Sequence, residues 1–152
     1  MLRPMARFLI VGGGQRALDL ATQLRSEGHA PRMTTRDPAR RAAIEAVGGE
    51  CVIADPDVVG TLRYALDNVT ILMWLLGCVD AEPLHGSRWK MMLERTIDTT
   101  VRGIVYERGT DDGEALTRQM AEYNGIPYAI IDAATDPWVP AAQAAVAELL
   151  HA

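Results

Sequence analysis

The stretch "FLIVGGGQRALDLATQLRSEGHAPRMTTRDP", residues 8–38, decides the fold. A short apolar run leads through three glycines into a segment whose small and apolar residues recur at the spacing of one buried helical face. These residues are Ala17, Leu20, Ala21 and Leu24. We predict a helix over residues 15–27, ended by Gly28, because glycine takes the left-handed conformation common after a helix C-terminus. A second strand is then expected before "TTRDP".

Apolar runs and helical patterns alternate along the whole chain, which is typical of βαβ units and a parallel sheet. The run "VTILMWLLG", residues 69–77, is continuously apolar, so we expect it near the centre of the sheet with helices on both faces. Six strands are predicted, at residues 8–11, 32–35, 51–54, 69–76, 103–106 and 128–131.

Three further helices are expected to begin at Asp-Pro pairs, because Asp caps free amide groups and Pro is tolerated in the first turn. The pairs are Asp37-Pro38, Asp55-Pro56 and Asp136-Pro137. Two more helices are predicted over residues 83–99 and 113–123, each packing one face on the sheet. The expected buried residues are Trp89, Met92, Leu93 and Thr96 in the first, and Leu116, Met120 and Tyr123 in the second.

Length and composition fit one globular domain over residues 1–152, with no internal repeat or boundary. The net charge of −5 argues against a nucleic-acid partner. The apolar runs, including the one near the N-terminus, are too short for a signal peptide or a membrane span. Cys51 and Cys78 are isolated and no metal-ligand spacing occurs, so we expect no metal site and a cytoplasmic location.

The glycines carry the main functional signal. Gly12, Gly14 and Ala17 fit G-x-G-x-x-A, in which the first position permits a tight turn, the second allows close approach of a pyrophosphate, and the third lets helix and strand pack closely. The phosphates would lie at the positive end of the helix, which Gln15 and Arg16 open. The pattern predicts a doubly wound α/β Rossmann domain with strand order 3-2-1-4-5-6. The alternative is a tight turn that binds nothing.

The end of the second strand indicates which dinucleotide is bound. An acidic residue there suits the ribose 2′-hydroxyl of NAD, whereas an arginine suits the 2′-phosphate of NADP. Here Arg36, helped by Thr35 and Arg40, is placed to form charge-assisted bonds with a phosphate. Asp37 competes, but it precedes Pro38 and is expected to cap a helix. NADP is therefore favoured over NAD, and solvated surface arginines are the alternative.

With the glycine loop, the segments "TTRDPARR", "CVIADP", "LRYALDNVTILMWLLG", "HGSRWKMMLE" and "VRGIVYE" occur in an order that resembles short-chain dehydrogenase/reductases of the extended or atypical kind. The resemblance covers about the whole chain and implies NAD(P) binding. It implies that Asp55 meets the adenine amino group, and that Leu75, Leu76 and Gly77 run beside the adenosine ribose.

The sequence also departs from that family. Its catalytic Tyr-x-x-x-Lys is absent, since the only lysine, Lys90, follows Gly86 by four positions. Glu107, after Tyr106, stands where the family has a serine, and the chain stops before a C-terminal substrate region. The catalytic residues are therefore unknown. Two hypotheses remain: a small atypical reductase or epimerase-like enzyme with an unknown substrate, and a non-catalytic dinucleotide-binding redox sensor or regulatory module acting on a protein partner.

Other side chains are candidates for acid–base or redox chemistry. His85 is a candidate acid or base, against an ordinary surface or capping role, because no oriented partner is apparent. Cys78 is a candidate redox group, against burial as a small apolar residue. Tyr106, Glu107 and Arg108 are expected to face the crevice, although "ERGTDDG" also fits an ordinary polar turn.

Two further expectations concern partners. A homodimer is predicted through the helices that follow the fourth and fifth strands, with contributions from Trp89, Met91 and Met92. A nucleotide-binding domain that regulates potassium transport shares the size and the glycine loop. That class usually has an acidic residue at the position of Thr35 and Arg36, so it ranks lower.

Overall fold

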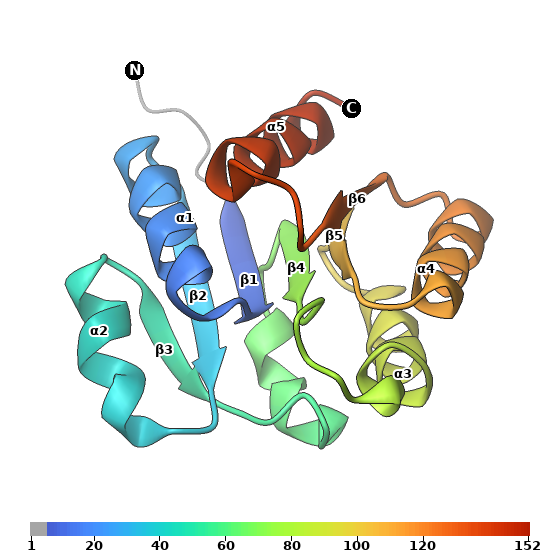
Figure 1. Ribbon diagram of the computed structural model, residues 1–152, viewed down its shortest axis with the longest axis horizontal. Coiled ribbons are helices and arrows are strands. Elements are labelled where there is room, and N and C mark those ends of the chain that lie inside the picture. Colours follow the sequence, from blue (N-terminus) through green and yellow to red (C-terminus); the bar gives the residue numbers. More distant parts are fainter. Residues whose placement is uncertain (1–5) are drawn as a thin grey trace.

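The computed structural model describes residues 6–152, and the first five residues of the N-terminal segment considered above lie outside it. A single sheet of six parallel strands runs in the order β3-β2-β1-β4-β5-β6 (Figure 1). The strands are β1 (Arg7–Gly12), β2 (Ala30–Thr35), β3 (Glu50–Ile53), β4 (Ile71–Leu75), β5 (Gly103–Arg108) and β6 (Tyr128–Asp132). The predicted fold class, number of strands and strand order are confirmed, and each strand begins and ends within two residues of its prediction.

Helices cover both faces of the sheet. The helices α1 (Gly14–Ser26), α2 (Arg41–Ala46) and α5 (Trp138–Leu150) pack on one face. The helices α3 (Ser87–Thr96) and α4 (Asp111–Tyr123) lie on the other face, with the short 3-10 segments η2 (Val59–Leu62) and η3 (Tyr64–Leu66). Figure 1 shows α1 and α5 as neighbours at the amino and carboxyl ends of the chain.

Strand β4 is buried along its whole length, as its continuous apolar sequence predicts. Ile71, Met73 and Leu75 belong to the core under α1 and α5. On the opposite face, the Trp74 ring stacks on Trp89 with centroids 4.8 Å apart, and Trp89 stacks in turn on Tyr106 at 5.6 Å. This stack of three aromatic rings joins β4, α3 and β5.

The Asp-Pro pairs begin helices less regularly than predicted. Asp37 caps the 3-10 segment η1 (Pro38–Arg40), because its carboxylate accepts the Ala39 N–H at 2.9 Å. Asp55 instead accepts the Asp57 N–H in a turn, and the next helical segment starts only at Val59. Asp136 precedes a cis bond to Pro137, and α5 then begins without a side-chain cap. Helical segments therefore begin at the first and third pairs, as predicted, but only Asp37 has the expected capping role, and the helix expected at Asp55 is wrong.

A buried arginine ties the irregular segment after β3 to β2. The Arg32 guanidinium donates to the carbonyl oxygens of Ala65 (2.6 Å) and Asp67 (2.9 Å) and to the Glu50 carboxylate (3.1 Å). The two carbonyls lie at the end of η3, where the last C=O groups of a helical segment have no partner within it. Two short 3-10 turns, η2 and η3, stand in place of the expected helix.

The helix predicted over residues 83–99 is divided into η4 (Glu82–Leu84) and α3, with Gly86 between them. The expected buried face of α3 is confirmed for all four residues. In α4, Thr117 and Ala121 are buried, whereas Tyr123 is 89 % exposed, so its predicted burial is wrong. The Thr117 hydroxyl accepts the Trp89 indole N–H at 2.7 Å on the inward face of α4, and the expected Leu116 and Met120 are partly buried against the same core.

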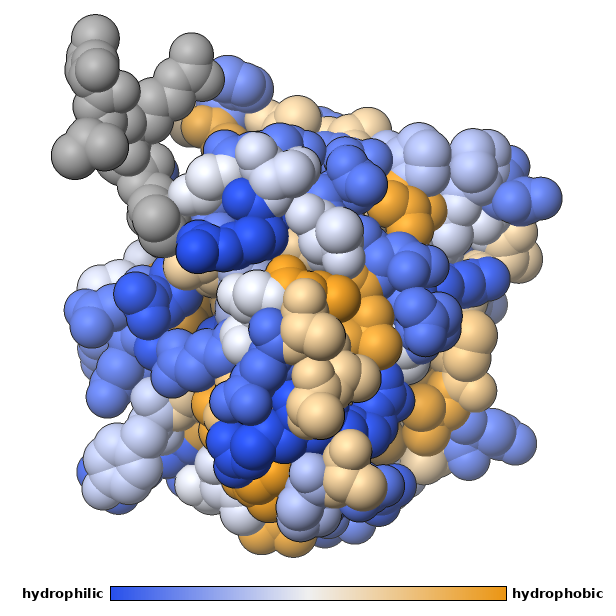
Figure 2. Space-filling model, turned by 90° about the vertical axis from the view of Figure 1, so that its left-hand side faces the viewer, coloured by the Kyte–Doolittle hydropathy of each residue, from blue (hydrophilic) through white to orange (hydrophobic). Residues whose placement is uncertain are grey.

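The surface gives no support to the interface residues expected for a homodimer. Trp89 and Met92 are completely buried within the protein, so their predicted role in an interface is wrong, and only Met91 is exposed. Figure 2 shows the side that carries α2 and the edge strand β3; hydrophilic side chains cover most of it, and apolar side chains form a strip between them. Within residues 6–152, no helix is long and apolar enough to span a bilayer.

Replacing Trp89 with Ala should destabilise the protein by about 3–5 kcal/mol, because it leaves a cavity between Trp74 and Tyr106 and removes the hydrogen bond that the Thr117 hydroxyl accepts from the indole. Chemical denaturation measures this loss. Met91→Ala, two positions along the same helix but exposed, is the matched control and should change stability by less than about 0.5 kcal/mol. Equal effects of the two substitutions would contradict the packing described here.

Candidate functional site

The glycine loop lies at the carboxyl end of β1, against β4. Gly12 has a φ of +80°, and a Cβ added to it would come within 2.7 Å of the Leu75 carbonyl oxygen. A side chain is therefore excluded at Gly12 by both backbone conformation and space. Gly14 has a φ of +55°, but a Cβ added there would meet no atom within 4 Å. The loop is thus closely packed at its first glycine and open at its third.

Helix α1 begins in this loop, with Gly13 as its N-cap residue. The Ala17 N–H donates to the Gly13 carbonyl oxygen at 3.3 Å, so the amides of Gly14, Gln15 and Arg16 precede the first hydrogen bond of the helix. Such amides carry the partial positive charge of a helix N-terminus. The arrangement is suited to an anion held in front of the loop.

A cavity of about 500 Å³ lies at the carboxyl ends of β1, β2 and β3 and beside the segment that follows β4. Six of the nine residues predicted to bind a cofactor line it: Gly12, Gly14, Thr35, Arg36, Asp55 and Leu76. Arg40, predicted to assist Arg36, lines it too. The structure therefore brings together residues that are up to 64 positions apart in the sequence.

The cationic side of the cavity is formed by Arg36 and Arg40. Arg36 is exposed, Arg40 is half-buried, and within residues 6–152 neither guanidinium forms a hydrogen bond or an ion pair. The neighbouring Asp37 accepts the Ala39 N–H, and the Asp37 N–H donates to the Thr35 hydroxyl at 3.1 Å. The carboxylate nearest to Arg36 in sequence is thus engaged in capping, as predicted.

The opposite wall contains Asp55 and Asp57 in the turn after β3. The Asp55 carboxylate accepts the Asp57 N–H at 2.9 Å, and the Asp55 N–H donates to the Thr61 hydroxyl at 2.9 Å. Asp57 is paired with Arg88 of α3 at 3.3 Å. These bonds hold the position of the Asp55 carboxylate at the cavity wall.

Three predicted residues do not line the cavity. The Gln15 side-chain amide donates to Asp19 at 3.0 Å along the helix, and the Gly77 N–H donates to the Glu107 carboxylate at 2.8 Å. The Arg16 guanidinium donates to the Ala133 carbonyl oxygen at 2.7 Å. The side chains of Gln15 and Arg16 are thus engaged elsewhere, and only their backbone amides lie at the predicted phosphate position.

Glu107 is a site residue whose environment the sequence did not reveal. It belongs to β5 and is 2 % exposed, so the interpretation of "ERGTDDG" as a solvated turn is wrong for this residue. Its carboxylate also accepts the Trp138 indole N–H at 2.8 Å. The only sequence signal was its position directly after the apolar strand "GIVY".

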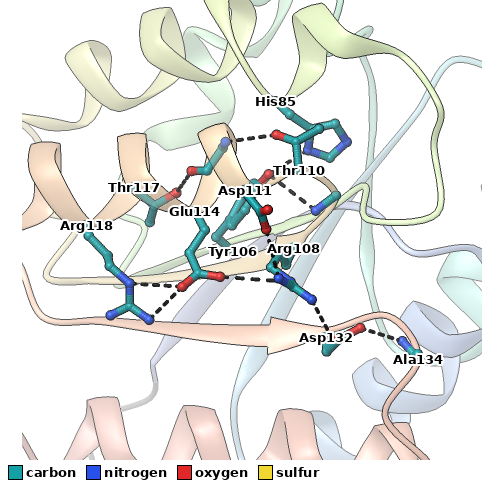
Figure 3. Close-up of polar contacts among 12 residues, drawn as sticks. His85, Tyr106, Arg108, Thr110, Asp111, Glu114, Thr117, Arg118, Asp132 and Ala134 are labelled. Carbon is teal, nitrogen blue, oxygen red and sulfur yellow. Dashed lines mark hydrogen bonds and ion pairs between the residues drawn. The ribbon is translucent and has the colours of Figure 1, made fainter.

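Arg108, the next residue, points to solvent and joins three elements. Its guanidinium lies 3.0 Å from Asp111 at the start of α4 and 3.3 Å from Asp132 at the end of β6 (Figure 3). The Ala134 N–H and the Arg108 guanidinium lower the pKa of Asp132, because both favour the charged carboxylate. The carboxyl ends of β5 and β6 are therefore tied together by side chains of the protein itself.

A second cavity of about 240 Å³ lies between the loops that follow β4 and β5. Cys78 is exposed there, so its expected burial is wrong. His85 also lines this cavity, although it is 2 % exposed. Among the described residues, no cluster of three His, Cys, Asp or Glu side chains is arranged to hold a metal ion.

His85 has the oriented partner that the sequence did not show. Its Nδ1 lies 2.7 Å from the Tyr106 hydroxyl (Figure 3). Its Nε2 lies 3.2 Å from the Val79 carbonyl oxygen. A carbonyl only accepts, so we assign the proton to Nε2 and the Tyr106 hydroxyl as the donor to Nδ1. Both ring nitrogens are engaged, and the expected surface or capping role of His85 is wrong.

The comparisons with known proteins concern the fold. No protein-family model matches the sequence, and no curated protein matches it significantly. Three solved structures illustrate the similarity. Triphenylmethane reductase from Citrobacter sp., complexed with NADP(H), aligns with a TM-score of 0.63 and 18 % identity over 81 % of this chain and 48 % of its own.

UDP-glucuronic acid 4-epimerase from Bacillus cereus, in complex with UDP-glucuronic acid and NAD, has a TM-score of 0.62 and 13 % identity over 82 % of this chain and 55 % of its own. The NADPH-dependent quinone oxidoreductase from Escherichia coli has a TM-score of 0.57 and 21 % identity over 81 % of this chain and 46 % of its own. The chain thus spans about half the length of these proteins.

Gly12→Ala should cost about 2–4 kcal/mol of stability, because it combines a left-handed backbone conformation with a contact too close to the Leu75 carbonyl oxygen. Gly14→Ala should cost only about 1–2 kcal/mol, since it has the backbone penalty without the steric one. Urea denaturation of both variants tests this difference. An equal loss in both would show that Gly12 does not approach β4 as described.

Burial raises the pKa of the Tyr106 hydroxyl, because the phenolate loses its hydration more than the neutral phenol does. Tyr106 should therefore remain protonated at a pH where an exposed tyrosine, with a pKa of about 10, is ionised. It should contribute stability below about pH 10 that is lost as the pH rises through its folded-state pKa. Absorbance at 295 nm should show a late-titrating phase that Tyr106→Phe abolishes; persistence of that phase would contradict the assignment.

Proposed function

We propose that this protein binds NADP(H). The adenine lies beside Asp55, the pyrophosphate rests against the amides at the start of α1, and the 2′-phosphate is held by Arg36 with Thr35 and Arg40. Leu76 and Gly77 run along the adenosine ribose. The observation that carries the proposal is that one cavity of about 500 Å³ is lined by the glycine loop, the arginines and Asp55 together.

The charges around the cavity support a phosphorylated ligand. Arg36 and Arg40 lie at the end of β2 without an ion-pair partner among the described residues, so their charge is uncompensated. A 2′-phosphate would supply charge-assisted hydrogen bonds, which are stronger than neutral ones. NAD would instead favour a carboxylate at this place, and Asp37 is engaged in capping. NADP is therefore favoured over NAD.

The solved structures of similar fold support a dinucleotide as the ligand, since they contain NAD or NADP(H). Their activities suggest a small atypical member of the short-chain dehydrogenase/reductase superfamily with a reductase or epimerase-like reaction. Such a reaction needs the nicotinamide held against a substrate in a water-poor site.

A non-catalytic regulatory module is the second candidate, and one observation favours it. The polar groups at the end of β5 bond to other groups of the protein: Tyr106 to His85, and Glu107 to Gly77 and Trp138. A catalytic acid or base needs a group within hydrogen-bond reach of the reacting atom. These three residues are instead fixed within the protein interior.

Calorimetric titration with NADPH and NADH tests the proposal. We expect micromolar NADPH binding that Arg36→Ala weakens by about 10–100-fold, because a hydrogen bond to a charged group contributes about 1.5–3 kcal/mol. NADH binding should change by less than about twofold, since NADH lacks the 2′-phosphate and so the contact that Arg36 would make.

Arg41→Ala is the matched control, because Arg41 lies five positions from Arg36, is exposed and does not line the cavity. Its NADPH affinity should remain that of the unmodified protein. Absence of binding to either nucleotide would refute the proposed function. Equal weakening by both substitutions would assign the arginines a general electrostatic effect and refute the 2′-phosphate contact.

A further inference from the structure

The large cavity covers only one half of the carboxyl edge of the sheet. Its lining residues come from the ends of β1, β2 and β3 and from the segment after β4, as far as Leu84. None of them belongs to β5, β6 or the loops that follow these strands, residues 103–137. The half of the edge where the second nucleoside of a dinucleotide would extend is built differently.

Glu107 fills part of that other half. Its carboxylate is buried and accepts two hydrogen bonds, from the Gly77 N–H at the end of β4 and from the Trp138 indole N–H at the start of α5. A Cβ placed on Gly77 would lie 2.6 Å from the Glu107 Cγ, so the side chain packs directly against the backbone there. A ligand that displaced this carboxylate would leave two N–H groups without their acceptor.

Arg16 reaches the same half of the carboxyl edge from α1. It leaves the first turn of α1 and donates to the Ala133 carbonyl oxygen in the loop between β6 and α5. Its guanidinium lies 5.6 Å from the Trp138 ring centroid and 4.0 Å from the Glu107 carboxylate. The side chain therefore joins the glycine loop to the β6–α5 loop.

We propose that the site recognises the phosphorylated adenosine half of NADP(H) and leaves the nicotinamide unrecognised, with Arg16 and Glu107 as the residues that exclude it. This inference rests on the proposed NADP(H) binding, favours the non-catalytic module over the reductase, and specifies the ligand class: an adenosine 2′-phosphate that carries a 5′-diphosphate. The protein then binds NADP⁺ and NADPH equally and does not sense their redox state.

The probe is 2′-phosphoadenosine 5′-diphosphoribose, which is NADP without its nicotinamide. Calorimetry should give dissociation constants for this analogue, NADP⁺ and NADPH that agree within about threefold, a difference of about 0.7 kcal/mol or less. Binding of NADP⁺ or NADPH more than about tenfold tighter than the analogue would overturn the inference while leaving the proposed function intact. That result would place the nicotinamide in the second cavity or over β5. Failure of all three to bind would overturn the proposed function as well.

Arg16→Ala tests the residue directly, because it removes the bridge to Ala133 and should let the nicotinamide enter. We expect NADPH to become at least about threefold tighter than the analogue in this variant. The ratio of the two constants is measured on one variant, so a partial loss of folded protein cancels from it. Arg95→Ala is the control; Arg95 is exposed on α3, has no ion pair within residues 6–152, and should leave the ratio at one. A ratio of one in Arg16→Ala would overturn the role of Arg16.

Discussion

Burial of β4 on both faces is the constraint on which the rest of the structure depends. A strand without a solvent face needs a helical layer on each side, and the chain supplies α1 and α5 on one side and α3 on the other. The same strand fixes the glycine loop, because Gly12 pairs with Leu75 and approaches its carbonyl oxygen. The order of strands reverses at this point: β2 and β3 lie on one side of β1, and the chain then crosses to the other side, where β4 pairs with β1. A crevice at the carboxyl ends of the strands is the ordinary result of such a reversal.

The two halves of that edge have opposite physical character. Over β1, β2 and β3, the open cavity holds arginine charge that no group within residues 6–152 neutralises. Over β5 and β6, Glu107 accepts hydrogen bonds from Gly77 and Trp138, Arg16 donates to the Ala133 carbonyl oxygen, and Arg108 pairs with acidic side chains. The arginine side chains of the first half have no hydrogen-bond partner within residues 6–152, whereas the polar side chains of the second half are hydrogen-bonded. The cavity over β1, β2 and β3 is therefore the part of this edge that has unpaired cationic groups for a ligand.

The fold was predictable from local signals. The apolar runs, the helical spacing before Gly28 and the G-x-G-x-x-A turn each lie within a few residues, and they predicted the sheet and two lining residues of the cavity, Gly12 and Gly14. The end of the second strand added Thr35 and Arg36, and the family resemblance added Asp55 and Leu76. The contacts that were missed join distant residues: His85 with Tyr106, Glu107 with Trp138, and Arg16 with Ala133. Sequence spacing carries no information about such pairs until the strands are ordered. Asp55 and Asp136 do not act as helix caps, because an Asp-Pro pair also suits a turn, and the Asp55 carboxylate accepts the Asp57 N–H in such a turn.

The bond between Arg16 and Ala133 closes a loop of 117 positions, whereas the lining of the large cavity ends at Leu84. Closing a longer loop costs more chain entropy, although the cost grows only slowly with length. A chain that is synthesised from its N-terminus emerges with the residues that line the large cavity first, and with Ala133, the partner of Arg16, later. During synthesis, the cavity residues precede the bridge across the neighbouring half by about fifty residues, a few seconds at ordinary translation rates of about 5–20 residues per second.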